Sequence, residues 1–140
     1  MAGVSEMARE EEGSGALPDS GQRRSFSTGS VRDVAEGKGR CDLLPPLAIL
    51  RLARHFEAGA KKYGDRNWEK GQPQHVLLDS GLRHTFRYLA GAYDEDHLAA
   101  AVWNLLCAMD QEERSKEGAL DGALIDIGPG AAPSALTKGP

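Results

Sequence analysis

The sequence predicts an all-α protein, built as an antiparallel helical bundle of about three to four helices. Three observations favour this class. Apolar residues recur at three- and four-residue spacing in three segments, which is typical of amphipathic helices. Proline and glycine punctuate these segments at positions typical of helix ends. No stretch of the body alternates between polar and apolar residues over enough positions to indicate a sheet.

The first helix is expected to run from Pro45-Pro46 to about Gly64. Proline suits the first turn of a helix, because the N–H that it lacks would have no helical partner there. Gly64 is a plausible residue to end the helix, since glycine tolerates the backbone conformation of a C-terminal cap. The apolar positions that keep helical spacing between these ends are Ile49, Ala53, Phe56 and Ala60.

Two further helices are expected, over about 74–90 and 94–114, joined by a short turn at Gly91–Tyr93. Three helices of this length leave much apolar surface uncovered, and the run Ala99-Ala100-Ala101 permits close approach of helices. We therefore expect a homo-oligomer in which facing helices complete the bundle. The expected core face of the second helix is Leu78, Leu82, Phe86 and Leu89, and the apolar arc of the third is Leu98, Val102, Leu105 and Met109.

The 140-residue chain predicts one domain between two flexible ends. Residues 1–22 are rich in Glu, Gly and Ser and are expected to be a disordered tail, while residues 23–114 form the helical domain. Within this domain, residues 25–42 are expected to be a loop. Residues 115–140 are expected to be a mobile tail, in which residues 123–127 could form a short strand or dock on the body.

The charge and hydrophobicity of the chain restrict its partners. A net charge of −4 with small basic clusters suits a small anion better than a nucleic acid. No apolar run approaches the roughly 20 residues that span a bilayer, and the first residues lack the apolar segment of a secretory signal. We therefore expect a cytoplasmic protein that binds no membrane. The two cysteines form no metal-binding pair by spacing, and Cys107 is expected to be a core residue.

A polar stripe on the third helix indicates a site. Asp94, His97 and Asn104 fall on one side of the helix, beside its apolar arc, where polar groups need a partner or a ligand. Glu57 lies on the first helix, and carboxylates are the ligands of Mg²⁺ or Mn²⁺, with Co²⁺ as a further candidate cofactor. The candidate metal ligands are Glu57, Asp79, Asp94 and Asp96, and the candidate catalytic residues are Glu57, Asp96 and His97.

Each of these residues also has a structural interpretation. Glu57 could pair with Lys61 one helical turn away, and Asp79 could interact with the dipole of an early helical turn. Asp94 could cap the third helix, and His84 could be a structural histidine.

Residues between the first two helices suit a phosphorylated substrate. The segment 61–68 combines cations for phosphate oxygens with aromatic rings on which a base can stack. Asn104 offers a donor and an acceptor to a base or a sugar. The candidate substrate-binding residues are Ser27, Thr28, Lys38, Arg40, Lys61, Lys62, Arg66, Asn67, Trp68, His84 and Asn104.

Four sequence runs together carry a resemblance to a known family. They are Ser-Phe-Ser-Thr-Gly-Ser-Val-Arg-Asp, Gly-Lys-Gly-Arg-Cys-Asp-Leu-Leu-Pro-Pro, Phe-Glu-Ala-Gly-Ala-Lys-Lys-Tyr-Gly-Asp-Arg-Asn-Trp-Glu-Lys-Gly and Asp-Glu-Asp-His-Leu-Ala-Ala-Ala-Val-Trp-Asn-Leu-Leu. Over roughly residues 25–109 the chain resembles the phage dATP/dGTP diphosphohydrolases, which are MazG-like all-α nucleotide pyrophosphohydrolases. The resemblance implies hydrolysis of purine deoxynucleoside triphosphates, dGTP to dGMP and dATP to dAMP, with release of pyrophosphate. It also implies a phage that needs dGMP for 2-aminoadenine nucleotides and removes dATP, with the enzyme in the host cytoplasm.

The chain departs from the broader MazG pattern, which has Glu-x-x-Glu on one helix and Glu-x-x-Asp on the next. Here the first helix offers only Glu57, and His97 stands where a typical member has a carboxylate. Two other functions are weighed beside this one. The chain could be a non-catalytic nucleotide-binding or helical interaction module, or a His-Asp type phosphohydrolase through Asp96-His97, although it lacks the further spaced histidines of that class.

Overall fold

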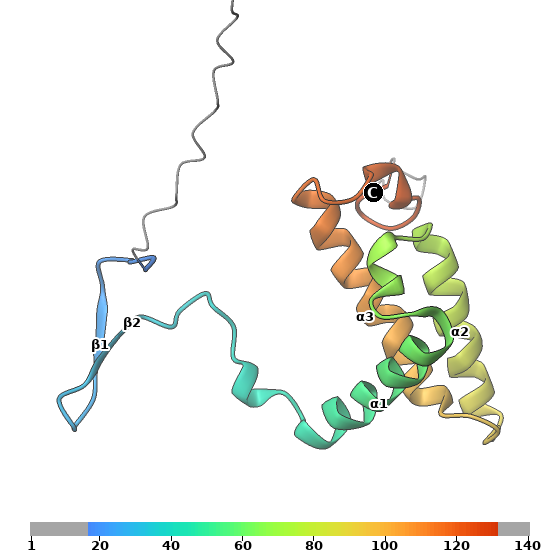
Figure 1. Ribbon diagram of the computed structural model, residues 1–140, viewed down its shortest axis with the longest axis horizontal. Coiled ribbons are helices and arrows are strands. Elements are labelled where there is room, and N and C mark those ends of the chain that lie inside the picture. The colour runs from blue at the N-terminus through green and yellow to red at the C-terminus, as the bar shows by residue number, and fades with distance from the viewer. Residues whose placement is uncertain (1–16, 132–140) are drawn as a thin grey trace, which may run out of the picture. The chain divides into compact units, whose positions relative to one another are not determined.

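The computed structural model describes residues 17–131, and contacts divide the chain into two compact units, one ending at Leu43 and the other beginning at Leu44. The strands are β1 (Arg23–Ser25) and β2 (Val31–Asp33), and the helices are α1 (Pro46–Tyr63), α2 (Gln74–Leu89) and α3 (His97–Lys116) (Figure 1). Short 3-10 helices occupy Cys41–Leu43, Asn67–Lys70 and Gly122–Leu124. The all-α class is confirmed. Of the two tails predicted above, residues 1–16 and 132–140 lie outside the described residues.

The first unit contains a small β-hairpin where the sequence analysis expected a loop. β1 pairs with β2 in antiparallel register, from Arg23 opposite Asp33 to Ser25 opposite Val31. Gly29 takes a φ of 87° in the connecting turn, a conformation that glycine adopts at little cost. The expectation of a loop was wrong because three-residue strands are too short to display an alternating pattern.

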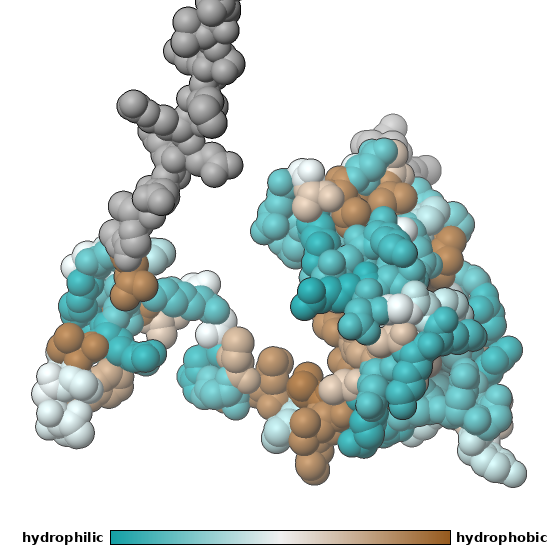
Figure 2. Space-filling view, viewed as in Figure 1, coloured by the Kyte–Doolittle hydropathy of each residue, from teal (hydrophilic) through white to brown (hydrophobic). Residues whose placement is uncertain are grey.

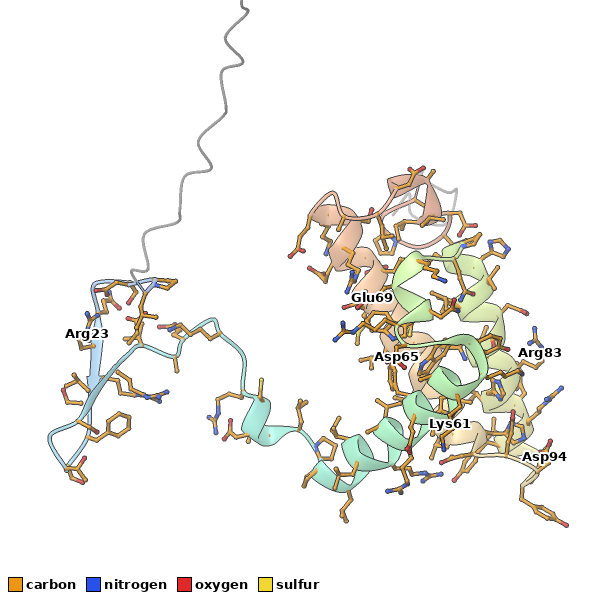
Figure 3. The ribbon with its side chains drawn as sticks, in the orientation of Figure 1. Arg23, Lys61, Asp65, Glu69, Arg83 and Asp94 are labelled. Carbon is orange, nitrogen blue, oxygen red and sulfur yellow. The ribbon has the colours of Figure 1, made fainter. Side chains whose placement is uncertain are left out.

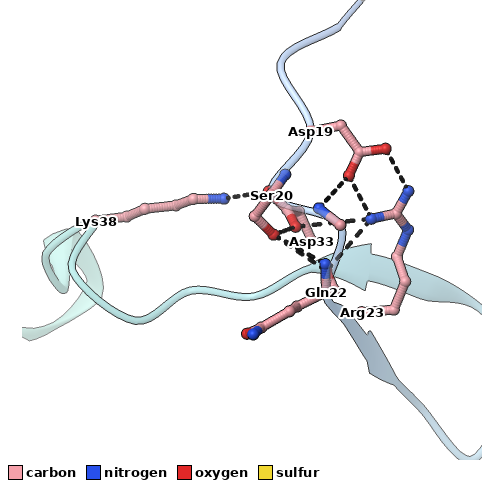
Figure 4. A network of polar contacts seen from close by, with 7 residues as sticks. Asp19, Ser20, Gln22, Arg23, Asp33 and Lys38 are labelled. Atoms are coloured by element: carbon pink, nitrogen blue, oxygen red, sulfur yellow. Dashed lines mark hydrogen bonds and ion pairs between the residues drawn. The ribbon is translucent and has the colours of Figure 1, made fainter.

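A network of polar contacts holds the base of the hairpin (Figure 4). The Asp33 carboxylate accepts hydrogen bonds from the Ser20 hydroxyl and from Lys38 Nζ, the latter at 3.2 Å. These contacts, led by the one from Ser20, lower the pKa of Asp33 to about 2. Arg23 pairs with Asp19 at 2.6 Å on the same side. The network ties the residues before β1 to the end of β2.

Local signals set the ends of the helices. α1 begins at Pro46 and ends before Gly64, whose φ of 91° terminates it as expected. α2 agrees with its predicted range to one residue. α3 begins at His97, later than expected, because the Asp96 side chain accepts a hydrogen bond from Ala99 N and caps the helix.

α2 and α3 form an antiparallel pair in close contact. Gln74 at the start of α2 contacts Gln111 near the end of α3, while His84 contacts His97 at the start of α3. A Cβ placed on Gly81 would lie 3.3 Å from the Cβ of Asn104, which shows how near the two backbones run. Ala99, Ala100 and Ala101 are buried, so the close approach expected from this alanine run is confirmed. α1 packs against α3.

The close approach of these helices places the large apolar side chains outside the helix pair. On α3 the buried side carries His97 and Asn104 of the predicted polar stripe, whereas the four residues of the predicted apolar arc are 37% to 60% exposed. The expected core face of α2 is also wrong, since its members Leu82, Phe86 and Leu89 are exposed. Between close helices only small side chains fit, so Gly81 and the alanines take the interior positions. Large apolar faces are left uncovered in the single chain.

Other apolar residues are exposed at the start of α1. Leu44, Leu47 and Leu50 are all exposed there, and the space-filling view shows hydrophobic residues gathered over this segment (Figure 2). Within residues 17–131, no helix combines the length and apolar content that crossing a bilayer requires.

The segment after α3 docks on the helical unit. Asp126 Oδ1 accepts the backbone N–H of His75 at 2.9 Å, and Ile125 is buried. Leu124 lies against Gly71, where a Cβ would approach Leu124 Cδ1 to 2.7 Å. Of the two possibilities for residues 123–127, the structure shows docking through a 3-10 turn, without a strand.

Candidate functional site

The helical unit contains a groove of about 1200 Å³, lined by residues of α1, the loop that follows it, α2, the turn before α3, and α3 itself. Its wall combines cations, carboxylates, imidazoles, amides and aromatic rings. The structure thus brings together many of the residues predicted from the sequence. Those that line the groove are Glu57, Lys62, Arg66, Asn67, Trp68, His84 and Asn104, joined by His55, Asp65, Glu95 and Trp103.

The last turn of α1 and the loop between α1 and α2 supply the cations and an aromatic ring. Arg66 adopts a left-handed conformation with φ of 55° and starts the 3-10 helix that carries Trp68. The Trp68 ring packs edge-on against Phe56, with ring centres 6.2 Å apart, and the Arg114 guanidinium lies 5.3 Å from its centre. These contacts hold an aromatic ring in the groove wall to which Lys62 and Arg66 also belong.

Three side chains converge at the start of α3. His84 Nδ1 on α2 lies 2.9 Å from His97 Nδ1 on α3. Glu95 Oε1, in the turn between these helices, lies 3.1 Å from His84 Nδ1 and 3.3 Å from His97 Nδ1. Imidazole nitrogens and carboxylate oxygens are metal ligands, so this histidine cluster of His84, Glu95 and His97 could hold a metal ion.

Asp94 orients the buried member of the histidine cluster. His97 is 1% exposed, and its Nε2 lies 2.7 Å from Asp94 Oδ1. This hydrogen bond lowers the pKa of Asp94, which is held as a carboxylate. Burial lowers the pKa of His84 and favours its neutral form. A carboxylate hydrogen-bonded to the outer ring nitrogen of a histidine, as Asp94 is to His97, is the arrangement that commonly supports metal-binding imidazoles.

Asn104 lies on the groove wall and is buried. Its Nδ2 donates to the Ala100 carbonyl one turn earlier, at 2.8 Å. The hydrogen bond orients the amide on the groove wall, which Trp103 also lines.

Three of the predicted metal ligands, Asp79, Asp94 and Asp96, lie outside the groove lining. Asp79 is exposed and pairs with Arg83 on the same helix. Both oxygens of Asp96 accept from Arg51, at 2.6 and 2.7 Å, and this ion pair is the main reason that its pKa falls to about 2. Figure 3 shows Lys61 on α1, Arg83 on α2 and Asp94 at the connection to α3. Lys61 is exposed and does not line the groove.

Four predicted substrate-binding residues belong to the first unit, which the structure describes by itself. Ser27 is exposed in the hairpin turn, where Thr28 Oγ1 lies 3.2 Å from Ser30 Oγ. Lys38 pairs with Asp33, and Arg40 pairs with Asp42. Their participation in the site stays a prediction.

The sequence analysis did not single out Glu95 or the pairing of His84 with His97. The stripe on α3 was drawn with helical spacing, whereas residues 94–96 precede the helix and follow turn geometry. The two histidines lie on different helices, so only the antiparallel register of α2 and α3 brings them together. The run of three acids before His97 was the available signal for Glu95.

A comparison with known families gives one match. The family model described as dATP/dGTP diphosphohydrolase, N-terminal, matches residues 28–121. The match covers about two thirds of the chain and includes all the residues that line the groove. No curated protein and no solved structure matches the chain.

Proposed function

The chain belongs to the dATP/dGTP diphosphohydrolase family of nucleoside triphosphate pyrophosphohydrolases, and on this premise we propose that it converts dGTP to dGMP and dATP to dAMP in a metal-dependent reaction. One observation carries the proposal. A single groove presents cations, aromatic rings and a cluster of carboxylate and imidazole groups. A purine deoxynucleoside triphosphate carries the three features that these groups recognise, which are a polyanion, a flat base and phosphate-bound metal ions.

The groove residues have separate roles in holding the substrate. Lys62 and Arg66 neutralise phosphate oxygens and the charge on the departing pyrophosphate. Trp68, held by Phe56, offers its ring to the purine. The amide of Asn104 contacts the base or the sugar, since it combines a donor and an acceptor.

The reaction is an attack of water on the α-phosphorus. The water oxygen bonds to phosphorus, the bond from phosphorus to the α–β bridging oxygen breaks, and pyrophosphate leaves with the electron pair. Glu57 accepts the proton of the water, because it lines the groove and makes no ion pair with any residue that the structure describes. A bound Mg²⁺, Mn²⁺ or Co²⁺ ion would polarise the phosphoryl group and stabilise the developing charge.

The donors on the groove wall fit such an ion. Carboxylate oxygens of Glu57 and Glu95 suit hard divalent cations, and the neighbouring imidazoles add nitrogen donors. In this proposal Asp94 orients His97, while Asp96 caps α3 and pairs with Arg51. Asp79 has no part in the chemistry, because it faces away into an exposed ion pair.

Product analysis tests the reaction. Incubation of dGTP with the protein and a divalent metal is expected to release dGMP and pyrophosphate in equal amounts. Glu57→Gln is expected to reduce the rate at least about 100-fold, whereas the control Glu113→Gln, an exposed carboxylate paired with Lys116, keeps it. Release of dGDP with phosphate, or of deoxyguanosine with triphosphate, would contradict the proposal. Tight dGTP binding without turnover would support the non-catalytic module.

The biological role follows the resemblance to phage enzymes. We propose that the protein supplies dGMP for 2-aminoadenine nucleotide synthesis and removes dATP in the cytoplasm of a phage-infected cell. Expression in a bacterial host is expected to lower the dATP and dGTP pools and to raise dGMP, measured by mass spectrometry. Unchanged pools with an active enzyme would contradict this role.

The exposed apolar faces of α2 and α3 support a homo-oligomer. We propose that a second copy covers Phe86 and Leu89 on α2 together with Leu105 and Met109 on α3. Burial of large apolar side chains provides the free energy of association. Leu105→Glu is expected to shift the mass in solution toward the monomer, measured by light scattering, while Glu113→Lys leaves it unchanged. A monomeric wild-type protein would contradict the proposal.

A further inference from the structure

We propose that the histidine cluster is a binding site for one divalent transition-metal ion, of the Mn²⁺, Co²⁺ and Zn²⁺ series, in preference to Mg²⁺. The role of this ion in dGTP hydrolysis rests on the proposed function. The identity of the ion and of its ligands does not. His84 and His97 supply nitrogen, and Glu95 supplies oxygen. The MazG pattern of carboxylate pairs does not contain such a donor set.

The spacing of the three ligand atoms matches a shared ion. The two Nδ1 atoms lie 2.9 Å apart, and Glu95 Oε1 lies 3.1 and 3.3 Å from them. Ligand atoms bound at about 2.0 to 2.2 Å from one ion stand roughly 3 Å apart when they share a face of its coordination shell. The cluster therefore already has the dimensions of one coordination face before any ion is added.

The hydrogen-bonding pattern leaves lone pairs directed at this face. His97 Nε2 donates to Asp94 Oδ1 at 2.7 Å, so in the neutral ring Nδ1 carries the lone pair. His97 Nδ1 then faces two further atoms, His84 Nδ1 and Glu95 Oε1, of which the carboxylate oxygen can only accept. If His84 Nδ1 carries a proton, this N–H can be donated either to His97 Nδ1 or to Glu95 Oε1, and the other contact stays without a donor. A cation between the three atoms would satisfy all of them.

The cluster is closed on one side and open on the other. His97 is fully covered within the helix pair, whereas the His84 and Glu95 side chains are 19% and 50% exposed and line the groove. An ion held there would keep coordination positions toward the groove for water or phosphate oxygens. Open positions of this kind distinguish a catalytic metal site from a structural one.

The donor types decide the choice of ion. Mg²⁺ prefers oxygen ligands and gives up its water reluctantly. Imidazole nitrogen favours the later ions of the transition series, in the order of their general affinity for nitrogen sites. Two nitrogens in a set of three therefore select against Mg²⁺. Asp94 strengthens the selection, because its carboxylate makes the His97 ring a better donor.

Metal binding by the full-length chain tests the site without reference to turnover. Protein stripped with a chelator is titrated with Co²⁺, followed by visible absorption and by calorimetry. We expect one ion per chain, with absorption bands typical of mixed nitrogen and oxygen ligands, and no displacement by a large excess of Mg²⁺. Zn²⁺ is expected to displace Co²⁺.

Substitutions then locate the ion. Glu95→Gln and His84→Gln are expected to lower Co²⁺ affinity at least about 100-fold, since each removes a ligand, and Asp94→Asn about tenfold. The Glu95 side chain is half exposed, so Glu95→Gln keeps the fold even if a histidine variant does not. The matched control is His75→Gln, a histidine of α2 that pairs with Asp126 outside the groove lining. It is expected to bind Co²⁺ as the wild type does.

The outcomes separate this inference from the proposed function. Absence of Co²⁺ binding, equal competition by Mg²⁺, or unchanged affinity in Glu95→Gln would overturn the metal site. If stripped protein with Mg²⁺ still converted dGTP to dGMP, the function would stand without the site. If Co²⁺ bound at the cluster and no metal supported turnover, the site would stand and the function would fail.

Discussion

Two polar clusters lie between α2 and α3, one at each end of the helix pair. At one end Gln111 Nε2 donates to Gln74 Oε1 at 2.8 Å, and Gln74 Nε2 donates to the Ala108 carbonyl at 3.1 Å. The Gln72 N–H donates to Gln111 Oε1 at 2.9 Å and completes this glutamine cluster. At the other end lies the histidine cluster.

The two clusters differ in their balance of donors and acceptors. In the glutamine cluster every contact joins a donor to an acceptor, both side chains are neutral, and both are buried. In the histidine cluster two ring nitrogens and a carboxylate oxygen face one another, and the group opens to the groove. Burial alone does not separate structural from functional polar groups. The excess of lone pairs in one cluster indicates a ligand, and the saturation of the other indicates a role in packing.

The largest effect is expected from breaking the histidine cluster. His84→Gln should lower the rate of dGTP hydrolysis at least about 100-fold, because it removes charge stabilisation at the reacting phosphate. Thermal melting of the metal-free protein should change little, since His84 is partly exposed. The rate of dGMP release under saturating metal is the measurement. A variant that kept most of its activity would place the chemistry elsewhere in the groove.

Substitutions in the glutamine cluster should lower stability and leave activity unchanged, the reverse of the pattern expected for the histidine cluster. Gln111→Ala is expected to lower the free energy of unfolding by about 2 kcal/mol, because it leaves Gln74 Oε1 without its donor and the Gln72 N–H without its acceptor. Urea denaturation measures this loss, while turnover per folded molecule should stay at the wild-type level. The double variant Gln74→Leu/Gln111→Leu should recover part of the stability, since it also removes the unpaired Gln74 amide oxygen and leaves only the Gln72 N–H without its acceptor. A double variant as unstable as the single one would contradict this account.

A smaller effect is expected at Asp96, next to the histidine cluster in sequence. Asp96→Ala should lower stability by about 1 kcal/mol through loss of the cap at Ala99 N. Asp96→Asn keeps an oxygen for the cap and should cost less, although the ion pair with Arg51 is lost. Chemical denaturation of the metal-free variants compares the two. Equal losses would show that the ion pair dominates.

The smallest effect concerns the surface contact beside the glutamine cluster. His75 donates to Asp126 and lowers the pKa of this carboxyl below its usual value of 3.8. The contact therefore stabilises the docked segment above about pH 4, and this contribution is lost as the pH falls through the lowered pKa. The protection of residues 122–127 against amide hydrogen exchange, relative to the intrinsic rate at each pH, should fall from pH 5 to pH 3 by more than that of α2. The variant Asp126→Asn should lose that difference, and a persistent difference would contradict the assignment.

Much of the fold could be predicted because its signals are local. Pro46 and Gly64 mark the ends of α1 through backbone preferences that hold in any fold. Residue type alone also indicated many of the residues that line the groove, because cations, carboxylates and aromatic rings suit a nucleotide wherever they meet. The hairpin was not predicted, since three-residue strands are too short to display an alternating pattern.

The sequence by itself determined where the helices lie and which chemical groups the protein can offer a substrate. The tertiary structure decided which side of each helix is buried and which side chains meet. Apolar periodicity marks a stripe on α3 without stating what covers it, and the small residues Gly81 and Ala101 brought the polar stripe inward. The meeting of His84 with Glu95 and His97 depends on the antiparallel register of two helices. Helix formation is a local balance of backbone and side-chain preferences, whereas register is set by packing between segments distant in sequence.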